Sequence, residues 1–136
     1  MNTTTLQYNP LLPLVARILI GVLFVVAGVS KLTAFAGTAG YLAKLGFPAP
    51  EAMAVLAIIF ELGGGILLII GWQARWAAWA LIAFVVIATF AAHRFWDFEA
   101  AQRTMQMNQF LKNFAIVGGL LMFVSFGPGS ASVDKR

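Results

Sequence analysis

The sequence predicts an all-α fold, an integral membrane protein whose four apolar segments form an antiparallel four-helix bundle across a lipid bilayer. Of its 136 residues, 61% are apolar and 10% are charged, whereas an ordinary soluble domain carries roughly 25% charged residues. Each apolar segment holds about 17–22 residues, which matches a hydrocarbon core of about 30 Å at 1.5 Å per residue. The two-residue period of strands is not seen, and a backbone within lipid must pair its polar groups internally.

The four helices are expected to form one transmembrane domain that covers the whole chain, at residues 11–32, 52–70, 76–92 and 110–126. Pro48 and Pro50 interrupt the chain before the second helix, and Glu51 favours the positive end of that helix. The short link 71–75 forces the second and third helices into an antiparallel hairpin. The most polar stretch, 94–107, is expected to be a loop before the fourth helix.

Charge and cysteine content exclude several classes of function. The net charge is +4, but the nine Lys and Arg residues are scattered and form no basic stripe, so nucleic acid is not an expected partner. The sequence contains no cysteine, so a redox role requires a bound cofactor or a partner protein. A single histidine, His93, gives no metal site. The distribution of positive charge leaves the orientation in the membrane open.

One stripe of the first helix is predicted to face the bundle interior. Arg17, Gly21, Phe24, Gly28 and Lys31 recur at steps of four, three, four and three, so they share a helical face. The two glycines allow another helix to approach closely. Arg17 and Lys31 are therefore expected to point inward near opposite ends of the helix. The alternative is that both reach outward and anchor the helix at the lipid headgroups.

Glu61 is the most informative polar residue. It lies near the middle of the second helix, too deep to reach water, and three glycines follow it at 63–65. A carboxylate at that depth is neutral unless a cation lies nearby. Arg17 is the expected partner, because the two residues differ in depth by about five residues, or roughly 8 Å at 1.5 Å per residue. The alternative is a buried ion pair that only fixes the helix register.

A second polar group is expected at the mouth of the bundle. His93 ends the third helix, and Lys112 and Asn113 lie at the start of the fourth. His93 is a candidate proton relay or ligand donor, although an interfacial histidine without such a role fits equally well. Capping and solvation of a helix start also explain Lys112 and Asn113. The candidate ligand-binding residues are thus Glu61, Arg17, Lys31, His93, Lys112 and Asn113.

Several short motifs follow one another in a fixed order. They are the glycine-containing stripe at 17–31, LGFPAP at 45–50, ELGGG at 61–65, HRFW at 93–96, FLKN at 110–113, GGLL at 118–121 and GPG at 127–129. Together they resemble the DoxX family of small four-helix bacterial membrane proteins over roughly residues 14–134. The resemblance implies a multi-pass protein of the bacterial inner (plasma) membrane.

The resemblance also suggests a redox role. Some DoxX-like proteins are subunits of a quinone-reducing thiosulfate oxidoreductase, and others are linked to membrane assemblies that handle thiol and oxidative stress. The leading hypothesis is a membrane subunit of such a redox system, which binds a quinone or a small anion and contacts a redox partner protein or a second copy of itself. If it is enzymatic, an oxidoreductase subunit is expected and not a complete enzyme. The alternatives are a non-catalytic membrane scaffold and a transporter of small solutes or protons.

Overall fold

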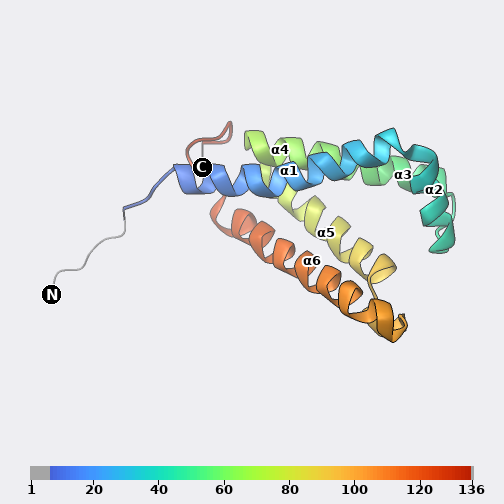
Figure 1. Cartoon of the computed structure of the whole chain (residues 1–136). Coiled ribbons are helices and arrows are strands. Elements are labelled where there is room, and N and C mark those ends of the chain that lie inside the picture. Colours follow the sequence, from blue (N-terminus) through green and yellow to red (C-terminus); the bar gives the residue numbers. More distant parts are fainter. Residues whose placement is uncertain (1–6, 136) are drawn as a thin grey trace.

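The computed structural model describes residues 7–135, and every regular element within that range is a helix (Figure 1). In chain order the elements are α1 (Leu11–Thr33), α2 (Phe35–Lys44), α3 (Pro50–Ile58), the π-helical turn η1 (Ile59–Gly63), α4 (Gly64–Ile70), α5 (Ala74–Ala92), the 3₁₀ turn η2 (Phe95–Asp97) and α6 (Ala100–Phe126). Among the described residues, four stretches are long and apolar enough to cross a membrane: Leu11–Thr33, Pro50–Ile70, Ala74–Asp97 and Ala100–Phe126. The predicted all-α membrane bundle is therefore confirmed.

The helices α1, α3–η1–α4 and α5 begin and end within two residues of the expected ranges 11–32, 52–70 and 76–92, but the fourth helix differs. α6 begins at Ala100 and not near Phe110, so the predicted polar loop 94–107 is wrong over its second half. Residues such as Gln102 and Arg103 are good helix formers. A helix that continues beyond the hydrocarbon region satisfies its own backbone, so a polar sequence there is compatible with an uninterrupted helix.

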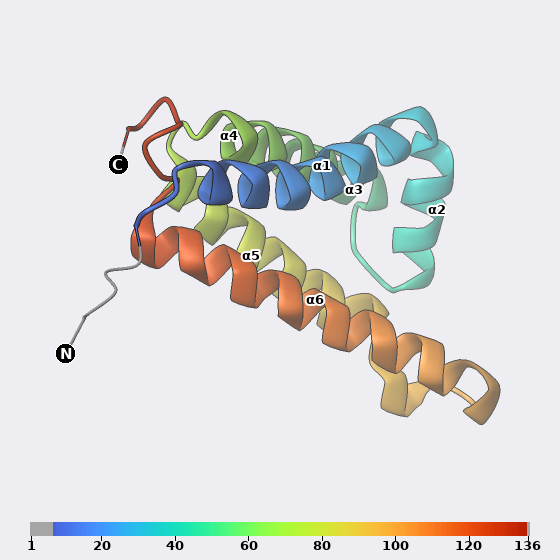
Figure 2. The same cartoon turned by 60° about the vertical axis from the view of Figure 1, so that its left-hand side comes forward.

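α2 is a short helix in a stretch where the sequence predicts no element. The chain turns at Ala34, whose φ of −116° and ψ of 46° are not helical, and α2 then leads away from α1. After α2, Gly46 adopts a left-handed φ of 85°, which a glycine accepts without steric cost, and the chain returns toward α3. α2 therefore packs beside α3 and lies across one end of the bundle (Figures 1 and 2).

The long helices form two hairpins that meet at one end and diverge toward the other. α1 pairs with the α3–η1–α4 segment, and α5 pairs with α6. Both views show the α5–α6 hairpin separating from α1 as it runs toward the end that carries α2 (Figures 1 and 2). We call the end with the α4–α5 turn and residues 127–134 the closed end. The end with α2 and η2 is the open end.

The hydrophobic core fills the junction of the hairpins: Phe24, Leu68, Ala78, Leu81, Ile82, Val85, Leu120 and Phe123. α1 and α4 approach so closely that a Cβ atom on Gly65 would lie 3.0 Å from the carbonyl oxygen of Gly21. Of the predicted inward stripe of α1, Arg17, Gly21, Phe24 and Gly28 are buried and Lys31 is partly exposed. The glycines of this stripe allow the backbones to pack closely.

Candidate functional site

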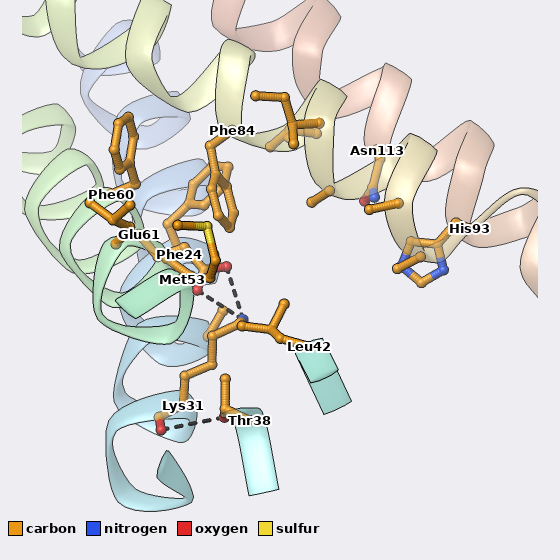
Figure 3. Close-up of a pocket in the computed structure, with 18 of the residues that line it drawn as sticks. Phe24, Lys31, Thr38, Leu42, Met53, Phe60, Glu61, Phe84, His93 and Asn113 are labelled. Carbon is orange, nitrogen blue, oxygen red and sulfur yellow. Dashed lines mark hydrogen bonds and ion pairs between the residues drawn. The ribbon is translucent and has the colours of Figure 1, made fainter. Parts of the chain in front are cut away.

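A cavity of about 580 Å³ lies between the two hairpins, on the open-end side of the core. It extends from Phe24 and Val85 in the core to Thr38 on α2 and His93 after α5 (Figure 3). Its wall is mostly apolar, with a few polar groups. Small-molecule sites in proteins have this character, with volumes of about 300–1,000 Å³.

An ion pair forms the polar part of one wall. The Lys31 Nζ atom lies 2.8 Å from Oε2 of Glu61 and donates a hydrogen bond of 3.1 Å to Oε1 (Figure 3). Glu61 is only 5% exposed, whereas the Lys31 side chain is 32% exposed. The ammonium group therefore compensates the buried carboxylate and remains accessible from the cavity.

The position of Glu61 depends on a local irregularity of its helix. Glu61 lies in η1, the π-helical turn Ile59–Gly63 between α3 and α4. A π-turn holds one more residue than an α-turn, so it changes the direction in which the following side chains point, and such turns are frequent at functional sites. Of the glycines that follow, Gly64 packs against Leu81 and Gly65 against the backbone of Gly21.

Arg17 does not pair with Glu61, which corrects the sequence-based hypothesis. Its guanidinium donates hydrogen bonds to the carbonyl oxygens of Ile69, at 2.9 Å, and of Ala131. The antiparallel register sets Arg17 beside Ile69, which lies about 12 Å beyond Glu61 along the helix at 1.5 Å per residue. Lys31, and not Arg17, is level with Glu61.

Residues after α6 complete the closed end around Arg17. The backbone N–H of Val133 donates to the carbonyl oxygen of Ile70 at 3.1 Å. The carboxylate of Asp134 accepts hydrogen bonds from the backbone N–H groups of Gln73 and Ala74, both at 3.1 Å. These N–H groups start α5 and have no partner within their own helix, so Asp134 caps α5 from a distant part of the chain.

The opposite wall of the cavity carries a second set of polar groups. His93 Nδ1 lies 2.7 Å from Oε1 of Gln106, and Asn113 Nδ2 donates to Thr89 Oγ1 at 3.0 Å. The Thr89 hydroxyl donates in turn to the carbonyl oxygen of Val85 at 2.6 Å. Asn113 therefore has a fixed orientation. One of its two amide hydrogens bonds to Thr89, and the other does not take part in that bond.

Lys112 lies at the rim of the same wall. It is exposed, and its Nζ donates to Oε1 of Gln109 at 2.6 Å. Five of the six predicted site residues thus line one cavity: Lys31, Glu61, His93, Lys112 and Asn113. Arg17 lies outside it and holds the closed end.

Sequence reasoning missed the residues that orient this second wall, Gln106 and Thr89. A signal for Thr89 was present, because it lies four residues before His93 and so shares its helical face. For Gln106 the signal was obscured by the expected loop. Within residues 7–135, no group of three or more His, Cys, Asp or Glu side chains is placed to hold a metal ion.

Known proteins resemble this chain over most of its length. The DoxX family profile matches residues 12–94. The inner membrane protein YphA of Escherichia coli (strain K12) is 34% identical over 128 residues, which cover 94% of this chain and 91% of that protein. The inner membrane protein YqjF of the same organism is 36% identical over 122 residues, or 90% of this chain and 88% of YqjF.

A weaker likeness extends to eukaryotes. The Surfeit locus protein 4 homolog of Schizosaccharomyces pombe is 32% identical over 84 residues, which cover 60% of this chain but 28% of that protein. No solved structure matches significantly. From the family profile, the two Escherichia coli relatives and the four apolar spans, the chain belongs to the DoxX family and is a multi-pass protein of the inner membrane.

Proposed function

We propose that this chain is a ligand-binding membrane subunit of a redox system, and that it holds a quinone or a small anion in the cavity between its hairpins. The observation that supports this most is the pairing of an apolar cavity with two polar walls. One wall carries the Lys31–Glu61 ion pair, and the other carries His93 and Asn113. Few but well-oriented polar groups in an apolar cavity are typical of small-molecule sites.

The donors of the cavity fit a ligand that accepts hydrogen bonds. Lys31 carries three N–H donors and Asn113 carries two, of which one reaches Thr89. With Lys112 at the rim, the lining holds two cations and one carboxylate, which favours an electron-rich or anionic head group. The carbonyl oxygens of a quinone and the oxygens of a small oxyanion both meet this description.

A bound quinone would supply two-electron, two-proton redox chemistry. This chain would bind and orient the head group, exclude water with its apolar wall, and hold a proton at the Glu61 carboxylate. The sequence contains no cysteine, so no thiol of this chain donates electrons. In this proposal a redox partner delivers the electrons, and the chain is an oxidoreductase subunit and not a complete enzyme.

Native mass spectrometry tests the proposal on protein extracted from its own membrane, with the retained lipids and quinones identified. Glu61→Gln removes the charge of the carboxylate but keeps its shape, and Glu51→Gln is the matched control because Glu51 is an exposed carboxylate on the same span. We expect wild type and Glu51→Gln to retain a quinone or small anion. Glu61→Gln should lower the occupancy by about tenfold, because the Lys31 ammonium loses the charge-assisted contact that holds it in place at the cavity wall.

Two results would contradict the proposal. One is that wild-type protein retains only bulk phospholipid, so that the cavity holds no specific ligand. The other is that Glu61→Gln and Glu51→Gln retain the same ligand equally well. A partner protein that co-purifies without any ligand would favour the scaffold alternative.

A further inference from the structure

We propose that the cavity takes its ligand laterally from the bilayer, through an apolar opening between α3–η1 and α5, and that this ligand is a membrane-dissolved amphiphile with a long apolar tail. This inference rests on the proposed function, because it requires that the cavity binds a ligand. It narrows that function, since a small water-soluble anion would have no use for such an opening.

The first argument is that several lining residues also face the outside of the bundle. Leu56 and Phe60 are 46% and 38% exposed, and Ile87 on the opposite hairpin is 62% exposed. All three lie within the predicted membrane spans, so they face lipid chains and not water. The cavity wall is therefore continuous with the lipid-facing surface at this side.

The second argument compares the residues that line the cavity on two sides, between α1 and α6 and between α3 and α5. On the α1–α6 side the apolar lining residues Leu23, Ala27 and Ile116 stand beside polar groups that an apolar tail would avoid, those of Gln109, Lys112 and Asn113. On the α3–α5 side the lining residues are apolar: Leu56, Ala57, Phe60, Ala83, Phe84, Ile87, Ala88 and Ala91. A tail placed at the second side leaves the head group facing Lys31 and Asn113.

The third argument is that α2 and the loop after it partly cover the cavity at the open end. Thr38, Tyr41 and Leu42 of α2 line the cavity from that end, and Leu45 and Phe47 follow from the adjoining loop. α2 packs against α3 and lies at the end of the first hairpin, so it covers the cavity from that hairpin's side (Figure 2). A ligand that enters from water would have to pass this cover.

A pair of aromatic rings closes the proposed opening. Phe60 and Phe84 stack with centroids 6.3 Å apart and an interplanar angle of 19° (Figure 3). The rings come from different hairpins, η1 and α5, whereas the other aromatic contacts of the described residues lie at the α5–α6 end. A stacked pair of this kind contributes only about 1 kcal/mol beyond the area it buries, so its separation is compatible with a gate.

The test measures how fast a bound quinone with a tail exchanges with the membrane. Protein loaded with decyl-ubiquinone in nanodiscs is mixed with vesicles that contain the deuterated compound, and native mass spectrometry follows the exchange. Because the natural chain has no cysteine, Phe60→Cys/Phe84→Cys can be joined by a short bis-methanethiosulfonate linker that a reductant cleaves. The matched control joins Ile20→Cys and Gly119→Cys across α1 and α6, where a Cβ atom on Gly119 would lie 3.0 Å from Cδ1 of Ile20.

We expect the Phe60–Phe84 link to slow exchange about tenfold or more without lowering final occupancy, and reduction to restore the rate. The Ile20–Gly119 link should leave exchange unchanged. Phe84→Ala should speed exchange several-fold, and Phe90→Ala, on the same helix but outside the cavity lining, should not.

The outcomes separate the two proposals. Unchanged exchange in the Phe60–Phe84-linked protein, with the quinone still bound, would overturn lateral entry and leave the proposed function intact. Equal occupancy by the tail-less ubiquinone-0, added from water, would overturn the requirement for a tail. If wild-type protein bound neither quinone, this inference would fail, and the proposed function would then depend on the retention of a small anion in native mass spectrometry.

Discussion

Arg17 and Lys31 lie on the same face of α1, one toward each end of the bundle, yet their surroundings differ completely. Arg17 is fully buried, and its acceptors are two backbone carbonyl groups. Lys31 is partly exposed and pairs with the side chain of Glu61 beside a cavity. Similar charges on one helical stripe therefore serve different purposes, and the neighbours decide which.

The two ends differ in how much space folding leaves beside the charged side chain. Around Arg17 the described chain supplies backbone acceptors from α4 and from the segment after α6, with little space for a ligand. Around Lys31 and Glu61 the helices diverge, so an ion pair borders open volume. We infer that the closed end maintains the bundle and that the open end binds. Three changes test this contrast.

The largest effect on stability is expected from Arg17→Met. This substitution keeps most of the volume but leaves two partly buried carbonyl groups without this donor, which should lower the free energy of unfolding by about 2–4 kcal/mol. Unfolding in mixed micelles measures the loss. Arg75→Met is the control, because Arg75 is exposed at the start of α5, near the same end. A loss below about 1 kcal/mol would contradict the structural role of Arg17.

A moderate effect is expected from the glycines that follow Glu61. In Gly65→Ala the new Cβ would lie 3.0 Å from the Gly21 carbonyl oxygen and 3.1 Å from the Phe24 Cβ, so the helices must separate, at a cost of about 1–3 kcal/mol. Gly63→Ala meets nothing within 4 Å and should be neutral or stabilising by up to about 1 kcal/mol. Equal effects of the two substitutions would show that the close helix contact does not hold.

The smallest effect on stability is expected at the ion pair, where the effect on binding should be greatest. A double-mutant cycle of Lys31→Met and Glu61→Gln should give a coupling energy of about 1 kcal/mol, because the Lys31 side chain is one-third exposed and partly screened. Each single variant should nevertheless lose its ligand in native mass spectrometry. A coupling above about 3 kcal/mol with ligand retained would assign the pair to stability and not to binding.

The fold was largely predictable from the sequence, because length and apolarity are sufficient to identify four spans. Lys31 and Glu61 were both identified as inward-facing, but the choice of Arg17 as partner was wrong. That choice required the register between two antiparallel helices. The register is set by the close contact of Gly21 with Gly65 and by the η1 turn, neither of which can be measured from residue spacing.

The polar environment was harder to predict than the spans. The polar sequence before Phe110 predicts a loop, whereas α6 already begins at Ala100, so the contact of Gln106 with His93 does not follow from the sequence. The role of Asp134 as a cap of α5 was also not predicted, since the two are 60 residues apart in the sequence. Contacts of this kind arise only once the helices have packed.

The hydrogen bond between Arg17 and Ala131 joins residues that are 114 positions apart in the chain. At a synthesis rate of about 5–20 residues per second, the ribosome needs roughly 6–23 s to produce the acceptor after the donor. During that interval α1 can enter the membrane with a guanidinium that at first lacks both carbonyl acceptors and then lacks the one at Ala131. The closed end is thus completed last. In a chain interrupted before residue 131, the Arg17 guanidinium lacks a hydrogen-bond acceptor within the bilayer, which distinguishes that chain from the finished protein.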